Sequence, residues 1–449
     1  MLKLLFACCL LWTCATAAFA VCPGNAGEPV PTAGDLKALD DQLASLAGQC
    51  GNDPGYLAYR GAVLNALGKA DEAAGFLEQA LLLNPDLAGA KVDYAEALAA
   101  TGDTSAASAL LKDLLARPDV PPELRAHLVR RLNAFEALHR FDALTGLQNW
   151  IGTEWQGTAA VSVRGGHDSN LNSAPSRDTL TLTFPGGEAE LLLAERFRRR
   201  GGATGLVEAS GQAARRLEGG AALQLYAEAR ARMSPSNSDT DYQQGQVAVG
   251  WSKPLRSGDA LFALSGTRLH YGGADLYSSA RFSVSRDWTY KDCRPRIGGE
   301  TEWRRYPAAS ELEGQFYGLT AGIACLLGSD RVAVGVRVGQ DFAQRERPGG
   351  DQRQVDLRIA WLAAVGNGTL FADAVVTFQR DEQGFSPLLE SNATRRLNRA
   401  SVHLEYAYPI ASGWAVLVSA DGTLQRSNID LFDVAGRAIY LGLRWQTLR

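Results

Sequence analysis

The 449-residue sequence is poor in several features, and each shortage excludes a class of protein. After residue 20 no apolar run is long enough for a transmembrane helix, so the chain could cross a membrane only as a closed sheet. A net charge of −4 provides no basic surface for nucleic acid. The five histidines have no metal-binding spacing, and no serine elbow is present. We therefore expect no cofactor, no metal site and no enzymatic activity.

Cysteines are few, and their distribution follows from the start of the chain. Lys3 is the only charge in residues 1–20, which continue with an apolar core and end in Ala18-Phe19-Ala20. This pattern predicts a signal peptide that directs export. It contains three of the seven cysteines, so four remain in an oxidising compartment. Four cysteines allow three pairings. Position favours Cys22–Cys50 and Cys293–Cys325 over the alternative of metal ligation.

Residues 21–150 are expected to form a helical domain, because the periodicity is helical from Asp35 to about Gln148 and a repeat is visible there. Several small and apolar residues between 61 and 77 recur 34 positions later. The pattern resembles the tetratricopeptide repeat, in which small residues allow two helices to pack closely and a proline ends the second helix. The residues that occupy these positions are Gly61, Ala73, Ala80, Pro85, Ala95 and Ala107. The resemblance implies a short α-solenoid with a groove for a peptide or protein, and the alternative is a spacer.

From residue 151 to the end, apolar and polar residues alternate one for one. Segments 221–232, 355–363 and 400–408 are the clearest examples. Successive side chains of a strand point to opposite faces, so each strand has one apolar and one polar face. Aromatic residues gather near the strand ends, as in the interfacial girdles of membrane barrels. They are Trp155, Trp251, Tyr271, Tyr317, Tyr406, Tyr408 and Trp414.

Tight turns and longer polar loops separate these segments in near-perfect alternation. This order predicts an antiparallel up-and-down outer-membrane barrel of about 14–16 strands, with turns on the periplasmic side. Counting Thr179–Phe184 as a strand, with a turn at Pro185-Gly186-Gly187, gives roughly sixteen strands. Dropping it or merging a weak pair would give fourteen, because the number must be even if both termini lie on the same side. Cys293 and Cys325 lie at equal distances from the loop between their strands. They should therefore face each other near the periplasmic rim.

The polar face of the strands carries charges of both signs, which suits a water-filled or plugged lumen better than a packed core. The residues expected to line the lumen are Arg230, Arg337, Asp356, Arg358, Asp373, His403 and Glu405.

The end of the first barrel strand carries a short motif. It comprises Gly166, His167, Asp168, Ser169, Asn170, Leu171 and Asn172. The motif resembles a signature of the surface lipoprotein assembly modulator (Slam) family, in which an aromatic residue usually stands where this chain has His167. The resemblance implies periplasmic tetratricopeptide repeats, a fourteen-stranded outer-membrane barrel, and delivery of lipoproteins or other proteins to the cell surface.

Two interpretations of the Asp168-Ser169-Asn170 block remain open. It could bind a cation or gate the pore, or it could form an Asx turn that starts the first outer loop, and we favour the turn. The final strand, 440–445, is similar to the signal read by the barrel-insertion machinery, although the usual last aromatic residue is missing.

The expected location is the outer membrane of a Gram-negative bacterium, with the helical domain in the periplasm. The expected partners are outer-membrane lipids, an exported protein or lipoprotein cargo, and the insertion machinery during biogenesis. Three functional hypotheses follow. The chain is a protein translocation or assembly factor, an exopolysaccharide export porin, or a barrel-anchored docking protein. A short solenoid and a lumen of mixed charge favour the first.

Overall fold

The computed structural model describes residues 22–23, 30, 36–101, 103–117, 125, 128, 132, 155–256, 258–327 and 330–447. The expected signal peptide and the expected domain boundary near residue 150 lie outside these residues, and both stay predictions. The chain divides into two compact units, residues 1–94 and 95–449, which are described in turn. Among the described residues, no helix is long and apolar enough to cross a membrane.

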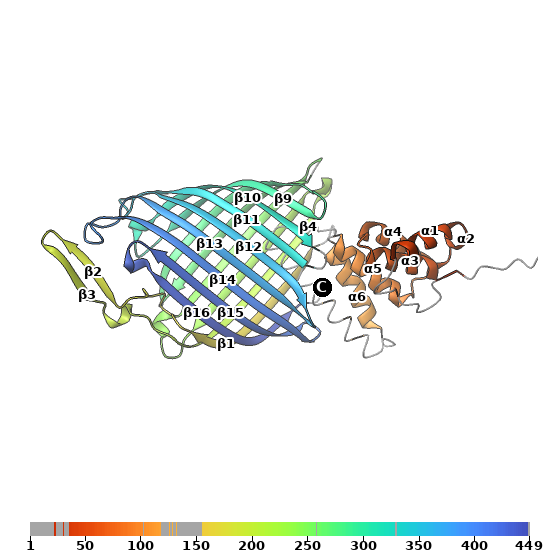
Figure 1. Ribbon diagram of the computed structural model, residues 1–449, viewed down its shortest axis with the longest axis horizontal. Coiled ribbons are helices and arrows are strands. Elements are labelled where there is room, and N and C mark those ends of the chain that lie inside the picture. Colours follow the sequence, from red (N-terminus) through yellow and green to blue (C-terminus); the bar gives the residue numbers. More distant parts are fainter. Residues whose placement is uncertain are drawn as a thin grey trace, which may run out of the picture. The chain divides into compact units, whose positions relative to one another are not determined.

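The first unit is built from antiparallel helices (Figure 1). Its helices are α1 Leu36–Ser45, α2 Ala47–Cys50, α3 Pro54–Ala66, α4 Ala70–Leu83 and the start of α5 Ala88–Ala100. Helix α3 begins where the side chain of Asp53 accepts a hydrogen bond from the Tyr56 amide, with Pro54 in the first turn. Gly68 adopts a φ of +74°, which lets the chain turn sharply between α3 and α4. The sequence pattern therefore forms a helical hairpin.

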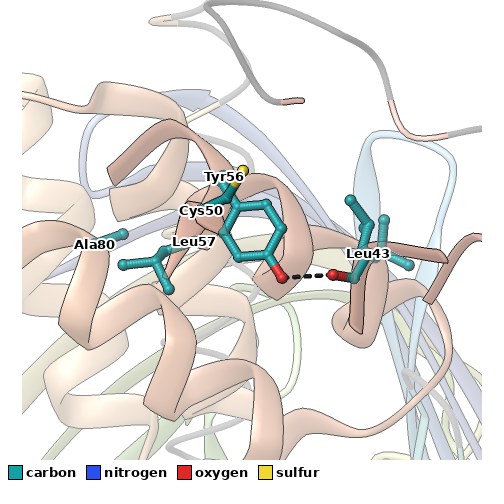
Figure 2. Packing of buried hydrophobic residues seen from close by; sticks show 6 residues of the cluster. Leu43, Cys50, Tyr56, Leu57 and Ala80 are labelled. Atoms are coloured by element: carbon teal, nitrogen blue, oxygen red, sulfur yellow. Dashed lines mark hydrogen bonds between the residues drawn. The ribbon is translucent and has the colours of Figure 1, made fainter. Parts of the chain in front are cut away.

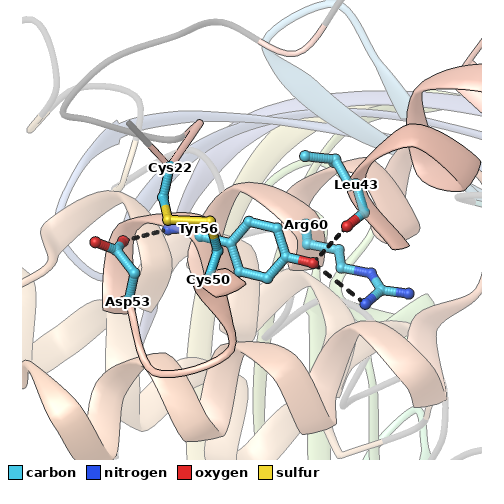
Figure 3. The surroundings of a disulfide bond; sticks show 6 residues. All are labelled: Cys22, Leu43, Cys50, Asp53, Tyr56 and Arg60. Atoms are coloured by element: carbon cyan, nitrogen blue, oxygen red, sulfur yellow. Dashed lines mark hydrogen bonds between the residues drawn. A yellow bond between two sulfur atoms is a disulfide. The ribbon is translucent and has the colours of Figure 1, made fainter. Parts of the chain in front are cut away.

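The core of this unit contains Leu43, Cys50, Tyr56, Leu57 and Ala80, each at most 2% exposed (Figure 2). The Tyr56 hydroxyl donates to the Leu43 carbonyl at 2.6 Å, so the ring is buried without an unpaired polar atom. The Cys22–Cys50 disulfide lies beside this ring, with Cα atoms 5.7 Å apart (Figure 3). It attaches the segment around residue 22 to α2.

The repeat-signature residues mark helix contacts. Ala73, Ala80, Ala95 and Ala107 are fully buried. At Gly61 a Cβ atom would lie 2.4 Å from Leu77 Cγ, so only glycine fits between α3 and α4. Pro85 follows the end of α4, and α6 spans Thr104–Ala116.

The second unit contains a closed barrel of fourteen antiparallel strands, in which β1 pairs with both β4 and β16 (Figure 1). The barrel strands are β1 Gln156–Asp168, β4 Gly202–Arg216, β5 Ala222–Met233, β6 Tyr242–Pro254, β7 Asp259–Tyr271, β8 Ala274–Asp287, β9 Cys293–Arg305, β10 Gly314–Leu327, β11 Asp330–Ala343, β12 Gln352–Val365, β13 Gly368–Gly384, β14 Thr394–Ala411, β15 Trp414–Ser427 and β16 Val434–Gln446.

The structure confirms the lower of the two expected counts, fourteen, because Thr179–Phe184 is not a barrel strand. It is β2, which pairs with β3 (Gly187–Leu192) in a separate two-stranded sheet within the long β1–β4 connection. The turn at residues 185–187 is the tip of this hairpin. Each strand has six residues, whereas crossing a bilayer takes about 9–11. The alternating pattern of β2 resembles that of the barrel strands, but its length does not.

Turns and loops segregate to opposite ends of the barrel, with one exception. The β7–β8 connection lies at the loop end and consists of Gly272 and Gly273 alone, both with positive φ. At the turn end, Cys293 and Cys325 are direct partners in the β9–β10 ladder and form a disulfide with a Cα separation of 4.0 Å.

The outer face of the barrel is apolar and the inner face polar. Along β1, Val161 and Val163 are 40% and 57% exposed on the outside, whereas Ser162 and Arg164 are 4% exposed on the inside. Several of the expected girdle residues, including Trp155, Tyr317 and Trp414, are also exposed. This division is that of barrels that span a membrane, where lipid contacts the outer face.

Candidate functional site in the barrel lumen

A cavity of about 370 Å³ opens inside the barrel. Strands β1, β4, β5 and β12–β16 contribute to its wall, and charged side chains of both signs line it. Of the expected lumen residues, five line this cavity: Arg230, Arg358, Asp373, His403 and Glu405.

The centre of the wall is a charge cluster at the β1–β16 seam. Glu405 on β14 accepts from Arg444 Nη2 at 2.6 Å and lies 3.5 Å from Arg164 Nη1. Arg164 also pairs with Glu208 on β4 and donates to Ser419 Oγ at 3.3 Å. The cluster therefore links strands on both sides of the seam, and the Arg164 side chain is only 3% exposed.

The other cavity charges form more open pairs. Arg358 Nε donates to Asp373 Oδ1 at 2.7 Å, with the arginine side chain 48% exposed. His403 Nδ1 lies 2.7 Å from Asp421 Oδ1. Arg230 lies 3.4 Å from Glu208. Each of these basic side chains faces a carboxylate, so this part of the wall is polar and carries no unpaired arginine among the described residues.

The two remaining expected residues, Arg337 and Asp356, belong to a second network, on β9–β12. Arg337 donates to Glu300 at 2.5 Å, Glu302 at 3.1 Å and Asp356 at 3.2 Å. Its guanidinium carbon lies 3.8 Å from the centroid of the buried Phe316 ring.

The expected lumen residues thus lie either in the wall of the cavity or in the second network. The sequence interpretation omitted Arg164, Glu208, Glu302 and Arg444, although each has the inward parity of its strand. Parity alone could have identified them. Within the described ranges, no group of three or more His, Cys, Asp or Glu residues could hold a metal ion.

Hydrogen bonds of the first-strand motif hold the start of the β1–β4 connection in place at the loop end of the barrel. The Asn170 amide donates to Asp168 Oδ1 at 2.8 Å, which is an Asx turn. Asn170 Nδ2 donates to the carbonyls of Ala174 and Ala435, both at 3.0 Å, and Asn170 Oδ1 accepts from the Ala174 amide at 3.0 Å. The residue is 6% exposed. These contacts match the turn interpretation of the motif.

The neighbouring motif residues make further contacts that hold this loop. Asp168 pairs with Arg232 at 3.1 Å. The Ser169 hydroxyl accepts from the Arg437 amide at 2.9 Å, and Asn172 Nδ2 donates to the Arg198 carbonyl at 2.7 Å. His167 is exposed and shares the outward parity of Val163. The motif thus joins β1 and its following loop to β5 and β16.

Gly166 and a nearby loop pair complete this region. A Cβ atom at Gly166 would lie 2.0 Å from the Ile439 carbonyl oxygen, so β1 and β16 require glycine there. Outside the strands, Arg200 donates to Asp239 at 2.6 Å, and this bond holds the pKa of the Asp239 carboxyl below its ordinary value.

Replacing Asn170 with alanine should loosen this loop and leave the barrel intact. The change leaves buried backbone groups without partners, which costs about 1–3 kcal/mol locally. We expect faster protease cleavage between residues 173 and 200, with an unchanged unfolding temperature of the barrel. An exposed control in the β12–β13 turn, Asn367→Ala, should not change the cleavage rate. Equal cleavage rates in the two variants would contradict this role of Asn170.

Comparisons with known proteins identify the helical region only. Residues 64–129 match the tetratricopeptide repeat family. The helical region is therefore a tetratricopeptide-repeat region that precedes the fourteen-stranded barrel. No curated protein sequence matches the chain significantly.

Several solved porins align with the barrel at low similarity. The anion-selective porin from Comamonas acidovorans is 9% identical over 66% of this chain and 100% of its own, with a TM-score of 0.36. OmpT of Vibrio cholerae, in its trimer form, is 10% identical over 65% and 99%, also at 0.36. A BenF-like porin from Pseudomonas fluorescens is 9% identical over 66% and 100%, at 0.34. At these values the alignments carry no further conclusion.

Proposed function

We propose that the chain is an outer-membrane translocation or assembly factor. Its tetratricopeptide repeats capture an exported protein or lipoprotein in the periplasm, and its barrel delivers this cargo to the cell surface. The observation that carries the proposal is the union, in one chain, of a repeat region of a protein-binding type with a barrel that is apolar outside and charged inside.

Two further observations support the proposal. The fourteen strands equal the number implied by the resemblance to the Slam family. The motif that carries this resemblance is built into the contact between β1, β5 and β16. These residues act structurally in the proposal, as a fixed start to the first outer loop. Cargo recognition is assigned to the repeats.

The nature of the lumen favours protein cargo over an export porin for a charged polysaccharide. A pore for a polyanion is expected to present unpaired cations along its length, because these attract the polymer. Here Arg164, Arg230, Arg337, Arg358 and Arg444 all face carboxylates. A barrel that served only as an anchor would not need a charged cavity.

Deleting the gene tests the proposal. We expect protease shaving of intact cells to show that one or a few proteins have left the surface, while their whole-cell amounts stay within about twofold of wild type. Restoring the gene should return them to the surface. A normal set of surface proteins together with lost extracellular glycan would instead select the porin hypothesis. No change in either would leave only the docking hypothesis.

A further inference from the structure

Three arginines form a row on the outside of the barrel. Arg353 on β12 is the direct partner of Arg380 on β13, and Arg380 is the direct partner of Arg396 on β14. All three side chains are exposed. They share the strand parity of the exposed residues Leu357, Phe378 and Val402, so they point away from the lumen.

The row has an excess of positive charge. Directly opposed like charges on neighbouring strands are destabilising, and this row contains two such contacts. Arg353 donates to Glu382 at 2.9 Å. In the part of the chain that the structure describes, the side chains of Arg380 and Arg396 have no carboxylate within ion-pair distance. An anion from outside the chain would relieve this repulsion.

Three other outward arginines at the loop end have acidic partners of their own, whereas the structure records no ion pair among the described residues for a fourth, Arg437. Arg268 lies 2.5 Å from Asp275, Arg305 lies 4.0 Å from Glu313, and Arg426 lies 3.3 Å from Asp433. Arg380 and Arg396 therefore differ from these three in charge balance, and from Arg437 in being directly opposed to other arginines.

The position of the three arginines along their strands indicates which kind of anion they would bind. The arginines lie near the loop ends of their strands, and the exposed apolar residues Leu357, Phe378 and Val402 follow toward the turn end. An amphiphile that places its acyl chains on this apolar face would bring its headgroup to the level of the arginines. Planar guanidinium groups bind phosphate through paired, charge-assisted hydrogen bonds.

We propose that Arg353, Arg380 and Arg396 bind the phosphate groups of a phosphorylated glycolipid in the outer leaflet of the outer membrane. This inference rests on the membrane location and orientation given under the proposed function, and it adds a lipid ligand to that function. The glycolipid neutralises the row and holds one side of the barrel, β12–β14, at a fixed depth in the membrane.

Binding of rough lipopolysaccharide to the purified, delipidated protein in detergent tests this site. Arg380→Gln with Arg396→Gln should weaken binding by about tenfold or more, because each change removes a charge-assisted contact. The control, Arg268→Gln with Arg305→Gln, removes equal charge from the same end and should weaken binding by less than about threefold. Lipopolysaccharide stripped of its phosphates should bind wild type and the row variant equally weakly.

Further arms separate the sources of phosphate and guard against misfolding. The variant Arg380→Lys with Arg396→Lys keeps the charge but loses the paired hydrogen-bond geometry, so its binding should lie between that of wild type and that of the glutamine variant. Competition by millimolar inorganic phosphate would overturn the glycolipid assignment in favour of a free anion. Equal loss in the row and control variants would overturn the site itself. Membrane flotation of the protein from cells reports separately on its proposed location, so the two failures are distinguishable.

Discussion

Replacing Glu405 with glutamine is expected to lower barrel stability more than removing an exposed carboxylate from the same cavity. Glu405 lies between Arg444 at 2.6 Å and Arg164 at 3.5 Å, and these arginine side chains are 11% and 3% exposed. Removing one partner of a buried ion pair leaves an uncompensated charge, which typically costs about 3–5 kcal/mol. Because the cluster spans the β1–β16 seam, closure of the barrel should weaken first. The temperature at which the folded band is lost in heat-modifiability gels measures the effect.

A matched control exists in the same cavity. Asp373→Asn also removes a carboxylate from an arginine, but Arg358 is 48% exposed and remains solvated. Exposed pairs contribute about 0–1 kcal/mol, so this variant should behave almost as wild type. Adding Arg444→Met to Glu405→Gln should recover part of the loss, because the unpaired charge is gone. If the two single variants lose stability equally, burial does not govern this cluster.

The alternation of apolar and polar residues was enough to predict most of the barrel. It assigned the polar parity on which Arg230, Arg358 and Glu405 were placed, because side-chain direction in a strand depends only on position along it. Equal spacing around one loop also placed Cys293 opposite Cys325, because antiparallel neighbours joined by a loop have a fixed register. Both inferences are local, and local geometry is what a sequence pattern encodes.

Two features depended on more than local pattern. The β2–β3 hairpin alternates as a barrel strand does, and only its length and its pairing with itself distinguish it. The contact of Arg164 with Glu405 joins residues 241 positions apart across the strand that closes the barrel. Parity shows that both side chains point inward, but their distance depends on strand number and on the stagger of the closed sheet. That stagger is a property of the whole barrel and not of any segment.

The repeat region provides the second large expected effect, because Gly61→Leu should unfold the α3–α4 hairpin. A Cβ atom at Gly61 would already lie 2.4 Å from Leu77 Cγ and 2.9 Å from Leu77 Cδ2, and leucine adds three more heavy atoms. Overpacking a close-packed core typically costs about 1–3 kcal/mol, and this contact leaves less space than most. Since a small helical unit has a free energy of unfolding of about 5 kcal/mol, we expect loss of its helical signal well below the wild-type temperature. Circular dichroism at 222 nm measures it as a separate transition, because the signal of the barrel stays constant while the barrel remains folded.

Gly75→Leu is the matched control for this change. Gly75 lies in α4, the same helical hairpin, but nothing is within 4 Å of a Cβ atom built there. Leucine also has a higher helix propensity than glycine, by about 0.5–1 kcal/mol, so the control should be as stable as wild type or slightly more stable. If the repeats capture cargo as proposed, Gly61→Leu should also remove the surface protein while the barrel still folds and inserts. A Gly61→Leu protein with an unfolded repeat region and normal surface delivery would show that cargo is recognised elsewhere in the chain.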